Sequence, residues 1–102
     1  MSVNMQVEFA GVTFDNPVTT CSGAYGFGIE YGEFVPVEKL GSITTKGLSA
    51  YPQMGNAGVR ITETPSGMLN CIGLENPGAE VFKAEYLPKM RERLGGCKII
   101  AN

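Results

Sequence analysis

Short β-branched segments alternate with helical segments along this chain, and this order restricts the folds that it can adopt. Strands are predicted at Val18–Cys21, Ser42–Thr45 and Lys98–Ala101, and the one long helical pattern, Ala79–Leu94, precedes the third strand. Strands separated by helices pair in parallel through right-handed crossovers. The sequence therefore predicts an α/β fold with a parallel sheet, in one domain because 102 residues suit at most one.

Two segments lie between the N-terminus and the second of these strands. Gln6–Phe9 and Val12–Phe14 alternate apolar and polar residues around a glycine and predict an N-terminal hairpin. Ile29–Leu40 predicts one or two short helical turns, interrupted by Pro36.

The helix at Ala79–Leu94 carries one apolar stripe. Its members recur at helical spacing and are Val81, Ala84, Leu87, Met90 and Leu94. Pro88 lies inside the pattern, so we expect it to kink the helix or to divide it into two pieces. Gly95 and Gly96 are expected to end it.

Composition excludes several classes of function. The chain has no histidine, so it offers no serine triad and no histidine-containing zinc site. Its three cysteines are far apart and form no metal or redox pair, which predicts reduced thiols in a cytoplasmic protein. A net charge of −2 without a basic face argues against nucleic-acid binding. No apolar run approaches the roughly 18 residues that a membrane span requires.

A long connection follows the second strand. Residues 47–66 are polar and rich in glycine and proline, and within them Val59–Thr64 predicts a local strand. The next segment, Thr64–Gly78, is too apolar for an ordinary surface loop and too rich in glycine and proline for a helix or strand interior. Connections this long in a compact domain are usually functional.

Two interpretations of Thr64–Gly78 stay open. In the first, apolar residues anchor the loop against a core, and Asn70, Asn76 and the amides around Gly73 face a ligand. The anchoring residues would be Met68, Leu69, Ile72 and Leu74. In the second, the asparagines only cap turns and the helix that follows.

Polar residues follow each of the three parallel strands. Ser22 follows the first, Lys46 and Gly47 follow the second, and Asn102 ends the third. Ligands of α/β folds bind at the carboxyl ends of parallel strands, so these residues are expected to converge on one site. Two interpretations of Ser22 and Asn102 stay open: both contact a ligand, or Ser22 is an ordinary turn serine and Asn102 only a terminal residue. Lys46, in contrast, is well placed for an anionic ligand.

Two other motifs are weaker. The glycines of Gly23–Gly28 resemble part of a dinucleotide fingerprint, but Tyr31 occupies the last glycine position, so we expect them to allow a sharp turn and a close approach instead. Cys71 has no activating neighbour and is interpreted as a packing thiol.

Taken together, a series of short sequence motifs along the chain resembles the N-terminal part of the class 1 dihydroorotate dehydrogenases, closest to the class 1B catalytic subunit. These motifs are Asn16-Pro17-Val18, Ser22-Gly23, Gly26-Phe27-Gly28 with Glu30-Tyr31, Leu40-Gly41-Ser42-Ile43, Thr45-Lys46-Gly47, Pro52 with Gly55-Asn56, Gly67-Met68-Leu69-Asn70, Ile72-Gly73-Leu74, Asn76-Pro77-Gly78 and Ile100-Ala101-Asn102. The resemblance covers nearly the whole chain in consistent order.

The resemblance implies a fold and an activity. The family fold is a (β/α)8 TIM barrel that binds FMN at its C-terminal mouth, and such barrels take about 250 residues. Residues 1–102 would supply its N-terminal third or so, with a hairpin and about three barrel strands. The family oxidises dihydroorotate to orotate in pyrimidine biosynthesis, with proton removal from C5 and hydride transfer from C6 to the flavin.

The resemblance also implies site residues. Ser22, Lys46, Gly47 and Asn102 match FMN contacts, and Lys46 also matches a substrate contact. The substrate loop corresponds to Asn70, Cys71, Ile72, Gly73 and Leu74. The catalytic base, a cysteine in class 1B, matches no residue here and is expected beyond Asn102. No metal site is implied.

Three residues depart from the family pattern. Cys21 and Cys71 stand where small residues are expected, and we interpret both as buried thiols. Glu75 stands where glutamine is more usual. The chain is further expected to be a fragment that does not catalyse the reaction alone and that exposes an unpaired edge of its parallel sheet.

The expected partners are dihydroorotate, an iron–sulfur and FAD electron-transfer subunit that uses NAD, and further copies of the full-length protein. Neither nucleic acid nor a membrane is expected. Two alternatives stay open: the flavin domain of a dihydropyrimidine dehydrogenase, and a non-catalytic truncated module.

Overall fold

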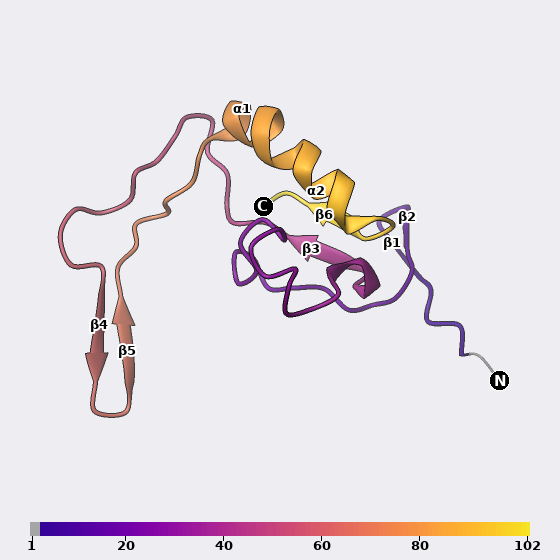
Figure 1. The fold of residues 1–102 in the computed structure, drawn as a ribbon, viewed down its shortest axis with the longest axis horizontal. Helices are drawn as coiled ribbons and strands as arrows, with labels where there is room; N and C mark the ends of the chain where they lie inside the picture. Colours follow the sequence, from indigo (N-terminus) through magenta and orange to yellow (C-terminus); the bar gives the residue numbers. More distant parts are fainter. Residues whose placement is uncertain (1–2) are drawn as a thin grey trace.

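The computed structural model describes residues 3–102, which contain three separate two-stranded sheets and one long helical run (Figure 1). In chain order the elements are β1 (Val7–Phe9), β2 (Val12–Phe14), the 3-10 turn η1 (Val37–Lys39), β3 (Ser42–Thr44), β4 (Ile61–Thr64), β5 (Gly67–Asn70), α1 (Ala79–Val81), the π-helical segment η2 (Phe82–Tyr86), α2 (Leu87–Leu94) and β6 (Lys98–Ile100).

The predicted N-terminal hairpin is confirmed. Strands β1 and β2 pair antiparallel, with Val7 opposite Phe14 and Phe9 opposite Val12. The two residues between them, Ala10 and Gly11, both have positive φ, at 51° and 76°. Such a turn matches the right-handed twist of the strands, which is why a two-residue connection closes the hairpin here.

The central parallel pair is also confirmed. Strands β3 and β6 pair in parallel, with Ser42 opposite Lys98 and Thr44 opposite Ile100. Between them in sequence, α1, η2 and α2 form a helical crossover, as expected for parallel strands. The predicted turns at Ile29–Leu40 reduce to the single turn η1, which begins directly after Pro36.

The strand predicted at Val18–Cys21 is wrong as a regular strand. Its contact with β3 is one parallel bridge, between Thr19 and Ser42. Side chains replace the rest of the ladder: the backbone N–H of Thr44 donates to the hydroxyl of Thr20 at 3.1 Å, and the hydroxyl of Ser42 donates to that of Thr19 at 2.7 Å. Residues 18–21 therefore lie beside β3 without forming a full ladder.

The helix from Ala79 to Leu94 is confirmed, but its apolar stripe is partly wrong. Met90 and Leu94 are buried, whereas Ala84 is exposed and Phe82 is buried instead. The π-helical segment explains the change, because its wider turn rotates the residues before Pro88 relative to an ideal helix. Leu87 begins α2 directly after this segment, and Pro88, which has no N–H to donate, lies in its first turn.

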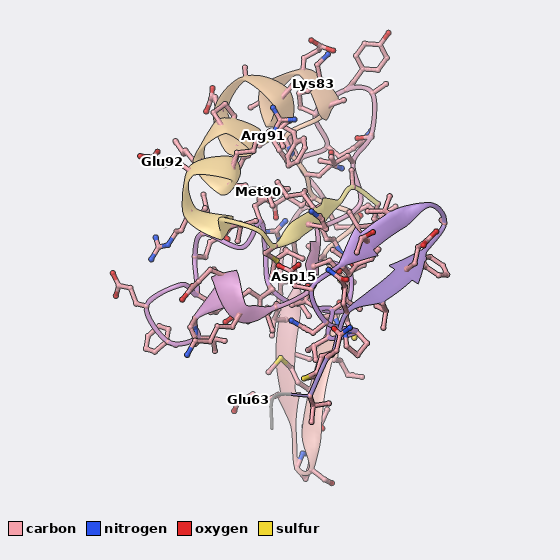
Figure 2. The ribbon with its side chains drawn as sticks, turned by 90° about the vertical axis from the view of Figure 1, so that its right-hand side faces the viewer. Asp15, Glu63, Lys83, Met90, Arg91 and Glu92 are labelled. Carbon is pink, nitrogen blue, oxygen red and sulfur yellow. The ribbon has the colours of Figure 1, made fainter. Side chains whose placement is uncertain are left out.

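The core lies between this helix and the parallel pair. Ile43 of β3 and Met90 of α2 are fully buried, and Val37, Leu94, Phe27, Phe82 and Cys97 surround them. Figure 2 shows Met90 between the helix and β6, while the exposed side chains of Lys83, Arg91 and Glu92 lie on the outer part of the helix. One apolar face of the helix thus covers one face of the sheet.

The long connection forms an arm that extends away from this core (Figure 1). The strand predicted at Val59–Thr64 is confirmed as β4, which pairs antiparallel with β5 across the turn at Pro65 and Ser66. The expectation that Thr64–Gly78 contains no strand is wrong, because β5 lies within it. Every residue of β4 and β5 is exposed.

The chain exposes more surface than a compact protein of its size. Its accessible surface is 7290 Å², against about 5,600 Å² for a compact monomer of this mass. Its radius of gyration is 15.9 Å, against about 13 Å. Within residues 3–102, β6 has β3 as its one partner strand, which confirms the expected unpaired parallel edge.

Across residues 3–102, no helix is long and apolar enough to cross a bilayer.

Candidate functional site

The residues predicted at the strand ends converge. The Ser22 hydroxyl donates to the carbonyl of Thr45 at 3.0 Å and accepts from the side-chain amide of Asn102 at 2.7 Å. The carbonyl of Asn102 in turn accepts from the N–H of Leu48 at 2.8 Å, directly after Gly47. Residues from three separate parts of the sequence thus meet at the carboxyl ends of β3 and β6.

Lys46 lies over the same place. A Cβ atom on Gly23 would lie only 2.5 Å from Cδ of Lys46, so the lysine stem packs directly on this glycine. Gly23 has φ of +69°, a conformation that also favours glycine. Within the described part of the chain, the Lys46 ammonium has no carboxylate partner. It is therefore available to an anionic ligand.

A hollow of about 410 Å³ adjoins these residues. Its lining combines the strand ends, through Gly47 and Asn102, with the predicted substrate loop, through Gly73 and Leu74. Leu48, Ser49, Gln53 and Asn76 complete the lining. The structure therefore brings part of the predicted cofactor set and part of the predicted substrate set to one cavity.

Asn70 and Cys71 lie elsewhere. Asn70 ends β5 opposite Ile61, and both Asn70 and Cys71 line a separate hollow of about 180 Å³ along the arm. Cys71 is exposed, as is Cys21, so the interpretation of both as buried thiols is wrong. The arm carries the side chains of Asn70 and Cys71 away from the core, and among residues 3–102 neither is buried.

The anchoring proposed for the loop is wrong for three of its four residues, while Ile72 is partly buried outside the core cluster. Met68 and Leu69 are each 63% exposed and Leu74 is 72% exposed, so none of them packs against the core. These side chains are spread along the arm, where no second layer of structure among residues 3–102 covers them.

Asn76 is a buried structural residue. Its side-chain oxygen accepts from the N–H groups of Ser49 and Gly78, at 3.1 and 3.0 Å, and from the Ser49 hydroxyl at 3.1 Å. Its side-chain amide donates to the carbonyl of Leu74 at 2.8 Å. The capping interpretation is thus confirmed for Asn76 as a turn cap, and because Asn76 also lines the hollow, its contact with a ligand stays a prediction.

The glycines of Gly23–Gly28 allow the predicted close approach. The carboxylate of Glu30 accepts from the N–H groups of Phe27 and Ile29, at 3.0 and 3.1 Å. A Cβ atom on Gly26 would lie 2.7 Å from that carboxylate. Gly26 therefore approaches this side chain, whereas Gly23 approaches Lys46 and Gly28 approaches Ile43.

Sequence reasoning missed the residues that shape the connection. Asn56 donates its side-chain amide to the carbonyl of Cys71 at 2.9 Å, and Arg60 pairs with Glu75 at 2.7 Å. The only signal in the sequence was a polar residue directly after Gly55, which does not identify its partner.

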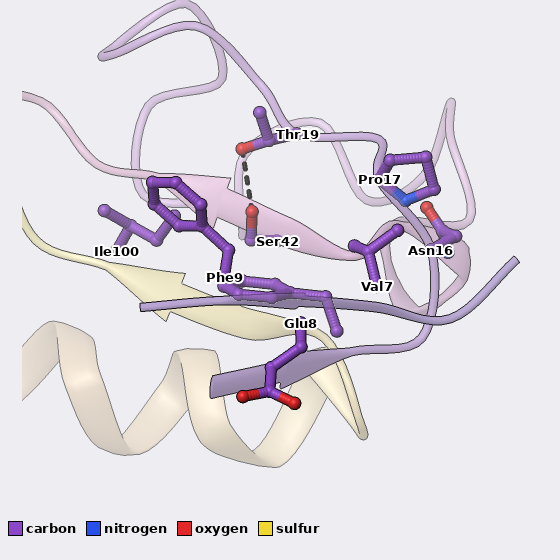
Figure 3. Close-up of a pocket in the computed structure, with 9 residues that line it drawn as sticks. Val7, Glu8, Phe9, Asn16, Pro17, Thr19, Ser42 and Ile100 are labelled. Carbon is purple, nitrogen blue, oxygen red and sulfur yellow. Dashed lines mark hydrogen bonds between the residues drawn. The ribbon is translucent and has the colours of Figure 1, made fainter. Parts of the chain in front are cut away.

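A third hollow, of about 380 Å³, lies beneath the N-terminal hairpin (Figure 3). Val7, Phe9 and Ile100 give it a mainly apolar lining, and the hydrogen bond between Thr19 and Ser42 lies at its edge. Such a lining offers no set of convergent polar groups. Within residues 3–102, no group of three histidine, cysteine, aspartate or glutamate side chains could hold a metal ion.

Comparison with known proteins gives consistent matches. The family model described as Dihydroorotate dehydrogenase matches residues 4–102. The chain is 59% identical over 100 residues to the dihydroorotate dehydrogenase B (NAD(+)) catalytic subunit of Lachnoclostridium phytofermentans, covering 98% of this chain and 33% of the relative. The proteins of the same name from Thermoanaerobacter pseudethanolicus and Latilactobacillus sakei are 49% and 45% identical, over 88% and 100% of this chain and 30% and 33% of theirs. The chain thus spans about a third of the length of these relatives.

Proposed function

The chain belongs to the dihydroorotate dehydrogenase family, and on that premise we propose that the protein containing it oxidises dihydroorotate to orotate in de novo pyrimidine biosynthesis. Residues 1–102 would form the N-terminal third or so of a (β/α)8 barrel. The observation that carries the proposal is the meeting of Ser22, Lys46 and Asn102 at the carboxyl ends of β3 and β6, beside a hollow. Barrel enzymes bind their ligands at this end of the strands.

The strand-end residues fit FMN as a cofactor. An isoalloxazine ring presents several acceptor atoms along one edge, and the side chains of Asn102 and Lys46 offer amide and ammonium donors. The Ser22 hydroxyl donates its one hydrogen to the Thr45 carbonyl and accepts from Asn102, so it would orient that amide. Gly47 has no Cβ, so the backbone at this point stays open to a flat ring. FMN, when bound, would supply the hydride acceptor. Ser22, Lys46, Gly47 and Asn102 would hold and orient it.

Lys46 would also bind the substrate. Its ammonium group offsets the negative charge of a carboxylate, and its stem is fixed in place by packing on Gly23. A cation that is already fixed where negative charge develops stabilises the transition state more than a cation that must first move into place. Lys46 would therefore bind the carboxylate of dihydroorotate and counter the charge on the reduced cofactor.

The substrate loop would contribute in two parts. Gly73 and Leu74 line the hollow and present backbone groups to it, with Ile72 adjacent. Asn70 and Cys71 belong to the arm, so in this proposal they reach the substrate when the arm lies over the mouth of the complete barrel. Fixed hydrogen bonds of this kind reject ligands that leave the buried groups unpaired. The catalytic base would lie outside residues 1–102.

The printed names of the relatives guide the proposal for partners. "Catalytic subunit" and "NAD(+)" support a separate electron-transfer subunit, which we propose carries FAD and an iron–sulfur cluster, in a cytoplasmic oligomer. The family match supports this function over the dihydropyrimidine dehydrogenase alternative and over a non-catalytic module.

An anaerobic titration of the full-length polypeptide tests the function. Flavin absorbance is followed as dihydroorotate is added, with dihydrouracil as the control substrate. We expect bleaching by dihydroorotate and none by dihydrouracil. Bound flavin that ignores dihydroorotate, or a protein without flavin, would contradict the proposal.

A further inference from the structure

Two limbs of the long connection run side by side between the core and the arm. One contains residues 53–60 and the other residues 71–76. At the core end, Gln53 and Asn76 exchange backbone hydrogen bonds of 2.9 and 3.0 Å. At the arm end, the N–H of Cys71 donates to the carbonyl of Arg60 at 2.8 Å. Between these two ends the limbs form an irregular strip, which contains residues 71–74 of the predicted substrate loop, while Asn70 belongs to β5.

Asn56 holds the middle of this strip. Its N–H donates to the carbonyl of Ile72 at 2.9 Å, and its side-chain amide donates to the carbonyl of Cys71 at 2.9 Å. A Cβ atom on Gly73 would lie 2.6 Å from the nitrogen of Asn56, so the two limbs pack without room for a side chain there. The first half of the loop is therefore fixed by backbone contacts.

Leu74 has the strained backbone position of the loop. It is one of two non-glycine residues among residues 3–102 with a positive φ, at 56°. Its side chain is 72% exposed, so burial does not hold this strained backbone in place. The side-chain amide of Asn76 holds the carbonyl of Leu74 at 2.8 Å, and the neighbouring residues, Gly73 and Glu75, must supply the rest of the constraint.

The side chain of Glu75 supplies a further constraint, from the other limb. Its carboxylate accepts from Nη1 of Arg60 at 2.7 Å, and the same Nη1 donates to the carbonyl of Met54 at 3.3 Å. Arg60 stands at the arm end of one limb and Glu75 near the core end of the other. The ion pair therefore crosses the strip diagonally and joins the two limbs directly after Leu74.

We propose that Arg60 and Glu75 are positioning residues for the substrate loop. Their ion pair holds the backbone of Gly73 and Leu74 at the hollow that also contains Gly47 and Asn102. This inference rests on the proposed function, because it takes that hollow as the site of dihydroorotate. The charge on Glu75, at a position where glutamine is more usual in the resembling family, thus has a partner and a role.

The pair acts on binding and not on chemistry. Neither side chain lines the hollow, so neither touches a reacting atom. Both are partly exposed, with 31% of the Arg60 side chain and 48% of the Glu75 side chain accessible. Solvent screens such a pair, so we expect its loss to weaken ligand binding about three- to fivefold. The rate at saturating substrate should not change.

The test uses the flavin-loaded, full-length polypeptide and orotate as the probe. Orotate dissociation constants are measured from flavin spectra for wild type, Arg60→Gln, Glu75→Gln and the double variant. We expect each single change to weaken binding about three- to fivefold, and the double variant to be no weaker than the single variants. The swapped pair, Arg60→Glu with Glu75→Arg, should restore affinity to within about twofold of wild type.

Glu80→Gln is the matched control, because Glu80 forms an equally short ion pair with Lys83, at 2.9 Å, on the exposed face of the helix. It should leave the orotate dissociation constant unchanged. The rate of anaerobic flavin reduction at saturating dihydroorotate should be equal in all variants. An orotate affinity of Glu75→Gln equal to that of Glu80→Gln, or additive effects in the double variant, would overturn the proposal.

Amide hydrogen exchange separates this proposal from the function that it rests on. The N–H groups of Asn56 and Cys71, which bond across the limbs, should exchange faster in Glu75→Gln than in Glu80→Gln. If wild type is not bleached by dihydroorotate, the proposed function fails and the exchange result still decides whether the pair holds the loop. Equal exchange in both variants would overturn the positioning role.

Discussion

Two pairs of strands in this molecule have similar hydrogen bonding and opposite surroundings. In the parallel pair of β3 and β6, Ser42 and Ile43 are buried beneath the helix. In the arm, β4 and β5 have a longer ladder, yet all their residues are exposed. Because a backbone hydrogen bond contributes little net free energy, burial must provide most of the stability of the parallel pair. The arm therefore depends on its turn, its cross-strand pairs and the contacts at its base.

The comparison also separates two parts of the proposed site. The parallel pair fixes the strand ends, where Ser22, Lys46 and Asn102 meet. The connection at the base of the arm carries the loop at Gly73 and Leu74. We therefore expect changes in the parallel pair to affect folding, and changes in the connection to affect ligand binding more than folding.

The largest expected effect tests this contrast directly. Ile43→Ala removes a fully buried side chain from β3 and should lower the free energy of unfolding by about 2–5 kcal/mol. Leu69→Ala removes a similar side chain from the exposed arm and should change it by less than about 0.5 kcal/mol. Urea unfolding of the full-length polypeptide measures both. Equal effects would show that the arm is packed in solution.

Gly23→Ala should disturb Lys46. The new methyl group would meet the lysine stem, and the residue would keep a positive φ, which costs about 1–2 kcal/mol for alanine. Gly11→Ala is the matched control, because Gly11 has a similar φ and no atom within 4 Å of the added carbon. We expect Gly23→Ala to weaken orotate binding about tenfold or more, and Gly11→Ala to leave it unchanged. A titration that finds equal affinities would remove Lys46 from the site.

A similar pair of glycines tests the connection. Gly73→Ala would place a carbon 2.6 Å from the nitrogen of Asn56, whereas Gly58 has the same kind of positive φ and open space around it. Both changes should cost about 1 kcal/mol of backbone strain. Only Gly73→Ala should also weaken orotate binding, by several-fold. If Gly58→Ala weakens binding as much, the limbs act as one strained unit without a special contact at Gly73.

The smallest expected effect concerns Cys97 in the core. Burial raises the pKa of its thiol, Asp15 raises it further, and Lys98 opposes both. In the unfolded chain the thiol ionises at its ordinary pKa of about 8.5. As pH rises through that value the unfolded state loses a proton that the folded state keeps, so stability falls. Urea midpoints between pH 7 and 10 should show a decline that is smaller in Cys97→Ala.

The sequence predicted the parts of the structure that local pattern determines. The N-terminal hairpin, β3, β6 and the helix follow from alternation, helical spacing and terminating glycines. The convergence of Ser22, Lys46 and Asn102 follows from strand order alone, since parallel strands end on one side of a sheet.

The remaining differences have physical causes that a single sequence does not express. The π-helical segment shifted the buried face toward Phe82, and no residue pattern signals such a turn. Hydroxyl groups of Thr19 and Thr20 replaced the ladder expected at Val18–Cys21. Met68 and Leu69 were predicted to be anchors because apolar side chains usually find cover, which residues 3–102 do not provide.

The pairing of β3 with β6 also has a consequence for how the chain folds. Ser42 meets Lys98 only after the whole connection and helix have been placed between them. The arm closes across a two-residue turn, and hairpins of this kind form in about 1–10 μs. Closing a long loop is entropically harder and slower. We therefore expect the exposed arm to form first, and the buried strands, which hold the proposed cofactor site, to be completed last.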